Sequence, residues 1–346
     1  MDIFHNFNKK AIILITGGAG FIGSAVIRRL LIETDCKIFN IDKMGYASDL
    51  SSIKKTLLKL GLKHEKRHKL LKVDLRNSSA IASAIEYSNP DLIMHLAAES
   101  HVDRSINNPE EFMMSNILGT FNLLEGARKH FEKLPFERKK YFRFHHISTD
   151  EVFGTVVNDN KFNEHTRYSP RSPYSASKAS SDHLVNSWHH TYGLPTLITN
   201  CSNNYGPWQY TEKLIPKIIF NAINNNKIPI YGDGSNIRDW LFVEDHVNGL
   251  LKVLKEGIIG ESYCIGGNEE KSNNEVVNII CEILDKKVPQ KNSYKQLINY
   301  VEDRLGHDKR YSIDTSKIKS ELSWEPKYSF QEAIDITVSW YINKFK

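Results

Sequence analysis

Residues 11–24 read AIILITGGAGFIGS, in which an apolar run leads directly into a glycine-rich turn. Gly18, Gly20 and Gly23 give the spacing G-x-G-x-x-G, and apolar residues recur at helical spacing from Val26 to Leu31. A strand, this turn and a helix suit a dinucleotide, because glycines let the backbone approach a pyrophosphate and the helix N-terminus offers free N–H groups. The stretch therefore predicts a Rossmann-type fold that binds a dinucleotide.

An acidic residue follows the next predicted strand. Asp42 comes directly after Lys37–Ile41, 19 residues beyond the last glycine of the turn. A carboxylate there would accept a hydrogen bond from the ribose 2′-hydroxyl of NAD and repel the 2′-phosphate of NADP, although the adjacent Lys43 weakens this preference slightly. Asp74, after the third strand Leu70–Val73, could reach the adenine or merely cap the strand end. We therefore expect NAD.

The first half of the chain alternates predicted strands and helices. Strands are expected at Ala11–Thr16, Lys37–Ile41, Leu70–Val73, Asp91–Leu96, Tyr141–Ser148 and Pro195–Cys201. Helices are expected near Ser51–Lys59, Ser78–Tyr87, Glu110–Lys129 and Pro173–Tyr192. Apolar strands that alternate with helices are typical of a parallel sheet covered on both faces. We expect an α/β fold with a Rossmann-type doubly wound parallel sheet.

Beyond Asn203 this alternation ends. Short strands are expected at Ile228–Tyr231, Trp240–Val243 and Ser262–Ile265, and helices near Asn274–Leu284 and Phe330–Asn343. This pattern predicts a smaller mixed α/β substrate-binding lobe. We expect residues 1–202 plus about 236–258 to form the NAD-binding domain, and about 203–235 plus 259–346 to form the lobe.

The composition is that of an ordinary globular protein, with 40% of the 346 residues hydrophobic and 25% charged. The formal net charge of +5 is spread along the chain, which argues against nucleic-acid and membrane-surface partners. No apolar run approaches the roughly 20 residues of a membrane span, and Met1–Lys10 lacks the apolar core of a signal peptide. The four cysteines lie far apart, so we expect no metal site and a cytoplasmic protein.

Tyr174 and Lys178 lie four residues apart and so share one face of the helix predicted at Pro173–Tyr192. Ser172 is a suitable N-cap for that helix. A tyrosine with its usual pKa of about 10 is a poor base at neutral pH, but a lysine ammonium and a nicotinamide cation nearby would favour the phenolate. A Tyr and a Lys at this spacing are usually exposed residues without a function. Here they follow a dinucleotide-binding turn in the sequence, which favours a catalytic interpretation.

Thr149, Asp150 and Glu151 directly follow the predicted strand Tyr141–Ser148. Ligands of open parallel sheets sit outside the carboxyl ends of the strands, so both carboxylates are expected in the same cleft as Tyr174. Two close carboxylates in different surroundings can hold different protonation states, one acting as an acid and one as a base. The alternative is a solvated acidic turn, which the apolar pair after Glu151 disfavours. Thr149 could hydrogen-bond a substrate hydroxyl.

Several stretches carry a resemblance to a known family. TGGAGFIGS at 16–24 and YSASK at 174–178 resemble the extended short-chain dehydrogenase/reductase superfamily. More specifically, the sequence resembles the family of dTDP-glucose 4,6-dehydratases in LAAESHVDRS at 96–105, STDEVFG at 148–154, YSASKASSDHLV at 174–185, NCSNNYG at 200–206, YGDGSNIRDWLFVEDH at 231–246 and DRLGHD at 303–308. The resemblance covers nearly the whole chain. Its Thr-Asp-Glu signature separates dehydratases from 4-epimerases, which lack both carboxylates in this loop.

The resemblance implies a hydro-lyase that converts dTDP-glucose to dTDP-4-keto-6-deoxyglucose with NAD. Tyr174, assisted by Lys178 and Thr149, would take the proton of the 4-hydroxyl while the C4 hydride passes to NAD. Glu151 would then remove the C5 proton and Asp150 would protonate the departing 6-hydroxyl. The hydride returns to C6 as C5 is reprotonated. Because the same hydride leaves and returns, we expect a tightly held cofactor in a closed cleft.

The same resemblance implies which residues hold the ligands. The expected cofactor-binding residues are Gly17, Gly20, Phe21, Ile22, Gly23, Asp42, Lys43, Asp74, Leu75, Leu96, Ala97, Ala98, Ser100, Ser115, Tyr174, Lys178 and Asn204. The expected nucleotide-sugar-binding residues are Ser100, Thr149, Asn203, Lys213, Leu214, Pro229, Tyr231, Arg238, Asn273, Arg304 and His307. Arginine suits a diphosphate because its planar fork donates two hydrogen bonds, although Arg238 and Arg304 could instead be surface ion-pair partners. His95 and His101 are interpreted as structural.

The sequence departs from the family's usual pattern at a few positions. Leu305 stands where proline is usual, Phe153 where tyrosine is usual, and Gly45 where a polar residue often follows the ribose acid. These departures bear on substrate affinity and nucleotide identity rather than on the reaction type.

Three alternatives stay open. One is a dehydratase of the same mechanism that acts on a UDP-, GDP- or CDP-sugar, and a second is a 4-epimerase or decarboxylase, which Asp150 and Glu151 disfavour. A third is a catalytically silent NAD-binding regulator, which would need neither these carboxylates nor the Tyr–Lys pair. Family resemblance also implies a homodimer, through helices resembling Glu110–Lys129 and Pro173–Tyr192.

Overall fold

The opening apolar run forms an inner strand of a seven-stranded parallel sheet in the computed structural model, which describes residues 11–158 and 160–345. The strand order is β10-β6-β5-β4-β1-β2-β3, with all neighbours parallel. The strands are β1 (Ile12–Thr16), β2 (Lys37–Asp42), β3 (His68–Lys72), β4 (Leu92–His95), β5 (Arg143–Thr149), β6 (Thr196–Cys201) and β10 (Ser262–Ile265). The predicted Rossmann-type doubly wound sheet is confirmed. Met1–Lys10, where we expect no signal peptide, lie outside the described residues.

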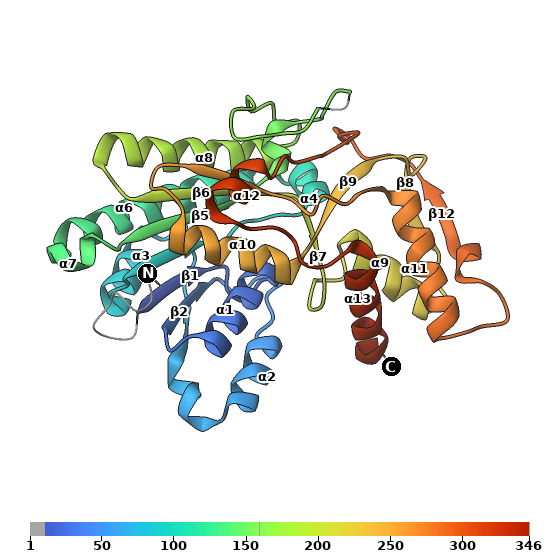
Figure 1. Ribbon diagram of the computed structural model, residues 1–346, viewed down its shortest axis with the longest axis horizontal. Helices are drawn as coiled ribbons and strands as arrows, with labels where there is room; N and C mark the ends of the chain where they lie inside the picture. Colours follow the sequence, from blue (N-terminus) through green and yellow to red (C-terminus); the bar gives the residue numbers. More distant parts are fainter. Residues whose placement is uncertain (1–10, 159, 346) are drawn as a thin grey trace.

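Helices cover both faces of this sheet (Figure 1). Side chains alternate across a strand, so Ile13 and Ile15 of β1 enter one apolar core and Leu14 enters the other. The first core includes residues of α1 (Phe21–Glu33), α2 (Ser51–Leu60) and α10 (Val243–Glu256). The second includes residues of α3 (Ser78–Ser88), α6 (Gly119–Lys133) and α8 (Pro173–Tyr192).

Short helical segments complete the Rossmann part. They are η2 (Leu62–Arg67), α4 (Val102–Asn107), α5 (Pro109–Phe112), η3 (Met113–Leu118), α7 (Phe136–Lys139) and η4 (Asp150–Phe153). The helix predicted at Glu110–Lys129 is thus not continuous, because a π-helical turn, η3, separates α5 from α6. Asn116 in that turn points inward and hydrogen-bonds both backbone groups of Glu99 and the hydroxyl of Ser177, which the wider turn allows.

The rest of the chain builds a smaller mixed α/β lobe, at the right of Figure 1. One three-stranded sheet has the order β11-β9-β7, and one parallel pair joins β12 to β8. The strands are β7 (Asn203–Tyr205), β8 (Ile228–Tyr231), β9 (Ile237–Phe242), β11 (Glu270–Ser272) and β12 (Ile298–Val301). The helices are α9 (Leu214–Ile223), α11 (Asn273–Lys287), η5 (Tyr294–Leu297) and α13 (Phe330–Phe345). The short helix α12 (Ser316–Leu322) instead lies against β10 and α10, beside the large sheet (Figure 1).

Two expectations for this half were wrong. Ser262–Ile265, which we placed in the smaller lobe, is β10 and pairs with β6 at the edge of the large sheet. The strand expected at Trp240–Val243 instead spans Ile237–Phe242, and Val243 begins α10. Glu244 and Asp245 in the first turn of α10 favour that helix start, since acidic side chains interact well with a helix N-terminus.

Across residues 11–158 and 160–345, the helices are all too short or too polar to cross a membrane. Within the same ranges, no three His, Cys, Asp or Glu side chains gather in a way that could hold a metal ion.

Candidate active site

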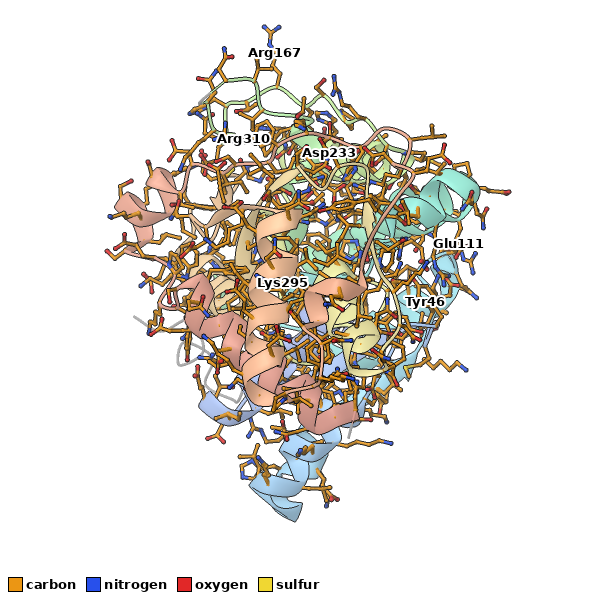
Figure 2. The ribbon with its side chains drawn as sticks, turned by 90° about the vertical axis from the view of Figure 1, so that its right-hand side faces the viewer. Tyr46, Glu111, Arg167, Asp233, Lys295 and Arg310 are labelled. Atoms are coloured by element: carbon orange, nitrogen blue, oxygen red, sulfur yellow. The ribbon has the colours of Figure 1, made fainter. Side chains whose placement is uncertain are left out.

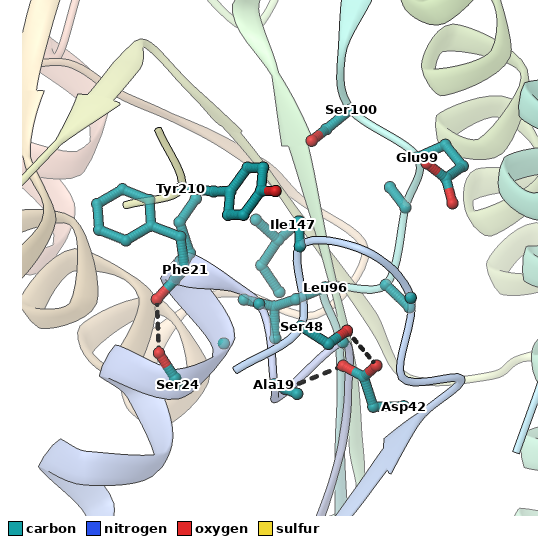
Figure 3. Close-up of a pocket in the computed structure, with 18 of the residues that line it drawn as sticks. Ala19, Phe21, Ser24, Asp42, Ser48, Leu96, Glu99, Ser100, Ile147 and Tyr210 are labelled. Carbon is teal, nitrogen blue, oxygen red and sulfur yellow. Dashed lines mark hydrogen bonds between the residues drawn. The ribbon is translucent and has the colours of Figure 1, made fainter. Parts of the chain in front are cut away.

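A cavity of about 340 Å³ lies at the carboxyl ends of the central strands. The glycine turn, the loops after β2, β3, β4, β5 and β6, and two residues of α8 line it. Figure 3 shows side chains from several of these loops turned toward one space. All seventeen residues expected to contact NAD lie in its wall: Gly17, Gly20, Phe21, Ile22, Gly23, Asp42, Lys43, Asp74, Leu75, Leu96, Ala97, Ala98, Ser100, Ser115, Tyr174, Lys178 and Asn204.

The glycine turn packs too tightly for side chains. Gly17 has a φ of +69°, and a Cβ there would lie 2.7 Å from the backbone of Ala97. A Cβ on Gly23 would lie 2.2 Å from the carbonyl oxygen of Gly17. The turn thus brings the start of α1, at Phe21, against the cavity without an intervening side chain. Backbone N–H groups at a helix start are what a pyrophosphate needs.

Asp42 ties the glycine turn to the loop after β2. Its Oδ2 accepts from the Ala19 N–H at 2.9 Å, and its Oδ1 accepts from the Met44 N–H at 2.8 Å and the Ser48 hydroxyl at 2.9 Å (Figure 3). The carboxylate is 7% exposed and lines the cavity. It is therefore a fixed negative charge where a ribose is expected, which opposes a 2′-phosphate.

Two further charges near Asp42 have partners. The Lys43 ammonium lies 2.6 Å from a carboxylate oxygen of Glu99 and 2.9 Å from one of Glu111. Because two carboxylates balance it, Lys43 does little to offset the charge of Asp42. The carboxylate of Asp74 accepts from the backbone N–H of Arg76 and pairs with the guanidinium of the same residue. This is the strand-end role that we considered, and Asp74 also lines the cavity.

The strand β5 delivers Thr149, Asp150 and Glu151 to the same cavity. Thr149 caps the turn η4: its Oγ1 accepts from the Glu151 N–H at 3.2 Å and donates to Asp150 Oδ1 at 3.3 Å. Val152 and Phe153 are buried in an apolar cluster and anchor the turn. Asp150 is 1% exposed, so the solvated acidic turn is excluded.

The two carboxyl groups have different surroundings. Burial, then the neighbouring Glu151, raises the pKa of Asp150 well above its ordinary value. Burial also raises the pKa of Glu151, but the cations Arg304, Lys213 and Arg238 oppose that rise. The cations thus lie nearer in effect to Glu151, whereas the charges that act on Asp150 include the carboxyl groups of Glu151 and Asp239. This asymmetry suits an acid beside a base.

Helix α8 places Tyr174 and Lys178 opposite these carboxyls. A capping box between Ser172 and Ser175 fixes the helix start. The Lys178 ammonium donates to the carbonyl oxygen of Ile147 at 2.9 Å. Burial, then Glu151, raises the pKa of Tyr174 well above its ordinary value. The net shift is upward because the phenol is buried beside carboxyl groups. The lowering expected from the sequence depends on Lys178 and a nicotinamide cation together.

The expected sugar-binding residues fall into two groups. Ser100, Thr149, Asn203 and Lys213 line the cavity. The structure does not bring the remaining expected residues into its wall, namely Leu214, Pro229, Tyr231, Arg238, Asn273, Arg304 and His307.

Part of that second group clusters beside the carboxyl groups of Asp150 and Glu151. Tyr231 donates to Asp103 at 3.0 Å, Arg304 lies 3.8 Å from the same carboxylate, and the His307 ring meets the Tyr231 ring edge-on. Arg238 is 5% exposed and donates to the Asp308 carbonyl oxygen at 2.9 Å. Arg238 is therefore not a surface residue, whereas Arg304 pairs with Asp103. The charges of both arginines oppose the pKa rise of the Glu151 carboxyl.

Sequence reasoning missed a group that borders the cavity. Tyr46 donates to Glu212 at 2.9 Å and meets the ring of Tyr210 edge-on. Arg104 stacks on Tyr46, 3.5 Å from the ring centre. Figure 2 shows Tyr46 and Glu111 on the same side of the molecule. The one sequence signal was the position of Tyr46 four residues after Asp42.

His95 lies behind the cavity. Its ring nitrogens bond the hydroxyls of Thr16 at 2.7 Å and Thr120 at 2.9 Å, and it is 1% exposed. This buried position fits the structural interpretation. His101 lies 3.6 Å from Glu212, next to the group just described.

Comparison with known proteins gives consistent matches. The family model described as GDP-mannose 4,6 dehydratase matches residues 14–337. A dTDP-glucose 4,6-dehydratase of Escherichia coli is 52% identical over 344 residues, which cover 96% of this chain and 93% of the relative. A solved dTDP-glucose 4,6-dehydratase from Streptomyces venezuelae with NAD bound has a TM-score of 0.86 at 38% identity, over 96% of this chain and 97% of that chain. Another, from Bacillus anthracis in complex with NAD, has a TM-score of 0.82 at 40% identity, over 96% of each chain.

Proposed function

The chain belongs to the dTDP-glucose 4,6-dehydratases, within the GDP-mannose 4,6 dehydratase family, and we propose that it dehydrates dTDP-glucose to dTDP-4-keto-6-deoxyglucose with NAD. One observation carries the proposal. The carboxyls of Asp150 and Glu151 share a single cavity with Tyr174, Lys178 and the glycine turn. A 4-epimerase or a silent NAD-binding protein would have no use for both carboxyls there.

The residues present fit NAD. The glycine turn leaves no room for a Cβ at Gly17 or Gly23, and the fixed carboxylate of Asp42 stands at the expected ribose position. Leu96, Ala97 and the other cofactor-binding residues expected from the sequence complete the wall. When bound there, NAD supplies a reversible hydride acceptor.

The chain's own groups handle the protons. We assign Tyr174 to the proton of the sugar 4-hydroxyl, with Thr149 holding that oxygen and Lys178 favouring the phenolate. Glu151, which lies near the cations Arg304, Lys213 and Arg238, removes the proton at C5, which a 4-keto group makes acidic. Asp150, whose pKa burial raises, donates a proton to the departing 6-hydroxyl so that water leaves.

Arginine and lysine side chains provide the charge for a diphosphate. Lys213 lines the cavity, while Arg238 and Arg304 act on the same carboxyl, Glu151, from the smaller lobe. We propose that these cations and the other expected residues of that lobe hold the nucleotide. Leu305, 75% exposed, lies outside this group and does not block it.

The chain is proposed to work as two lobes. As expected from the sequence, residues 1–202 with about 236–258 would bind NAD, and about 203–235 with 259–346 would bind the nucleotide sugar. Because β9 pairs with β7 and β11, we propose to count Ile237–Phe242 with the second part. Because β10 pairs with β6 of the large sheet, we propose to count Ser262–Ile265 with the first part. Since β5 and β6 end where the lobes meet, the reaction would take place between them.

A homodimer is also proposed, through α6 and α8. These helices expose Phe121 and Tyr192 at 39% and 50%, and both rings contact Trp188 edge-on. An aromatic cluster of this kind on two long helices is suited to a second copy of the chain. We propose a cytoplasmic location as well, which agrees with the family's small-molecule chemistry.

The function is tested by the product. Purified protein is incubated with dTDP-glucose in deuterated water, and the sugar is examined by NMR. The expected product is a 4-keto-6-deoxy sugar that carries deuterium at C5. UDP-, GDP- and CDP-glucose serve as parallel substrates. Turnover of one of these with none of dTDP-glucose would overturn the proposed substrate, and recovery of a C4 epimer would overturn the proposed reaction.

A further inference from the structure

Asp182 is a buried carboxyl group that the proposed reaction does not use. It lies on α8 four residues after Lys178, with no exposed surface. Its Oδ2 accepts from the hydroxyls of Ser148 and Tyr168, both at 2.8 Å, and from Asn200 Nδ2 at 3.2 Å. Burial pushes the pKa of this carboxyl up, but its hydrogen bonds and the charge of Lys178 hold it below its ordinary value. Asp182 is therefore an anion in the protein interior.

Lys178 is a buried cation that needs such an anion. The residue is 4% exposed, and burial lowers the pKa of its ammonium while Asp182 raises it. Its hydrogen bond to the Ile147 carbonyl oxygen satisfies one N–H but supplies no charge. A buried ammonium without a counter-charge would lose its proton, so its charged state depends on Asp182.

His146 lies between the two charges. Its Nε2 is 3.3 Å from Lys178 Nζ and 3.1 Å from Asp182 Oδ1. Burial, then Lys178, lowers the pKa of His146 to about 4, so the ring is neutral at pH 7 and carries one N–H. That proton belongs on Nε2, which faces the carboxylate, because Nδ1 has no hydrogen-bond partner among the described residues. The ring thus fixes the carboxylate beside the ammonium.

We propose that Asp182 is a positioning residue for the reaction, which with His146 keeps Lys178 charged and holds its ammonium at the end of β5. The inference rests on the proposed function, in which Tyr174 acts as the base. Asp150, Glu151 and Tyr174 line the same cavity as Lys178. Among the described residues, the titratable groups whose charges interact with Lys178 are Asp182 on the same helix, His95 from β4, His146 from β5 and Cys201 from β6, and Asp182 is the carboxyl in this set. Its negative charge is therefore the one on which the ammonium relies.

A direct test measures the titration of Lys178. The protein is labelled with ¹⁵N at the lysine side-chain nitrogens, and the signal of Lys178 is assigned with Lys178→Arg. In Asp182→Asn the ammonium loses its counter-charge, so its titration should move to lower pH by about one unit or more. An unchanged titration would overturn the proposal. This readout needs no substrate, so it separates the role of Asp182 from the identity of the reaction.

Activity gives a second readout. In Asp182→Asn the loss of rate at alkaline pH should begin at lower pH, and kcat at pH 8 should fall roughly tenfold to hundredfold with little change in KM. Tyr168→Phe is the matched control, because it removes one hydrogen bond to Asp182 and keeps the charge. Its pH limits should match those of the wild type. A purely structural role would lower the yield and the melting temperature of Asp182→Asn with no shift of its pH limits, and would overturn the proposal.

His146 offers an independent pair of variants should Asp182→Asn fail to fold. His146→Leu removes the donor to Asp182 Oδ1 and should shift the Lys178 titration to lower pH. His146→Gln keeps a side-chain N–H that can reach the carboxylate and should restore much of the wild-type titration. Equal titrations in the two variants would overturn the proposal.

Discussion

Two adjacent side chains have opposite roles in the proposed reaction, one as proton donor and the other as proton acceptor. Asp150 and Glu151 are neighbours in one turn, and burial is the largest cause of the raised pKa of each carboxyl. The cations Arg304, Lys213 and Arg238 oppose the rise for Glu151, whereas Glu151 and Asp239 push the pKa of Asp150 further up. These different surroundings suit a proton donor beside a proton acceptor. From the sequence, these two roles follow only from the family resemblance, because the two residues are simply consecutive acids.

Asp150→Asn and Glu151→Gln test these roles. Each variant removes one proton-transfer group with little change in shape, so dehydration should fall about 10²- to 10⁴-fold. NAD binding, measured by calorimetry, should stay within a few-fold of the wild type because the glycine turn is untouched. Normal dehydration rates in both variants would contradict the assigned mechanism.

Gly23→Ala tests the cofactor turn. Its new Cβ would lie 2.2 Å from the carbonyl oxygen of Gly17, so the turn must shift. A strained contact of this kind costs about 1–3 kcal/mol, which weakens NAD binding roughly tenfold to hundredfold. Gly45→Ala is the control, since its Cβ would meet its nearest neighbour at 3.6 Å in the same cavity. Equal NAD affinities in the two variants would show that the tight packing of the glycine turn does not determine NAD binding.

At the scale of elements, the start of α8 sets the position of Tyr174. Ser172 and Ser175 form a capping box there, and Ser272 and Glu275 form another at the start of α11. Loss of either serine cap should cost about 1 kcal/mol of unfolding free energy. Only Ser172→Ala, two residues from Tyr174, should also lower kcat, whereas Ser272→Ala should not. Urea unfolding and steady-state kinetics on both variants decide this, and equal kcat values would rule out the positional effect.

The elements also show what local sequence can predict. The bounds of Pro173–Tyr192 were predicted correctly because Ser172 caps its start and Gly193, with a φ of +65°, ends it. Glu110–Lys129 was predicted as one helix because its apolar spacing hides the π-helical turn. In that turn Asn116 contacts Glu99 and Ser177, which are distant in sequence, so a local pattern does not predict the turn.

In the candidate site, too, local sequence predicts some residues, whereas contacts between distant parts of the chain were missed. Residues that directly follow a strand or a glycine turn, such as Asp42 and Glu151, were placed correctly in the cavity wall, since the ends of parallel strands meet at one edge. Tyr210 and Glu212 were missed, because a loop from the far half of the chain brings them to Tyr46. No local sequence pattern predicts a contact between residues so far apart in the chain.

At the scale of the whole molecule, buried histidines should make stability depend on pH. Burial lowers the pKa of His68 and His146 to about 4, and of His145 and His246 to about 3, from an ordinary value of 6.5. Below pH 6.5 the unfolded chain takes up protons that the folded protein excludes, so stability should fall as the pH drops from 6.5 toward 4. Urea midpoints at pH 7 and pH 5 measure this. A midpoint at pH 5 equal to or above that at pH 7 would contradict it.

The proposed dimer has its own test. Phe121→Arg places a charge in the exposed aromatic cluster of α6 and α8 and should yield monomers in analytical ultracentrifugation. Leu58→Arg, at a residue 74% exposed on α2, is the matched control and should leave the sedimentation of the wild type unchanged. A wild-type protein that sediments as a monomer would contradict the proposed dimer.

The place of β10 at the edge of the large sheet has a consequence for biosynthesis. Its partner β6 ends at Cys201, but β10 begins only at Ser262. A nascent chain that has emerged from the ribosome as far as β6 must therefore keep that strand's outer backbone groups unsatisfied until some sixty further residues are translated. Chaperones that bind exposed strand edges would act during this interval. A premature stop codon before Ser262 would leave the edge of β6 permanently unpaired.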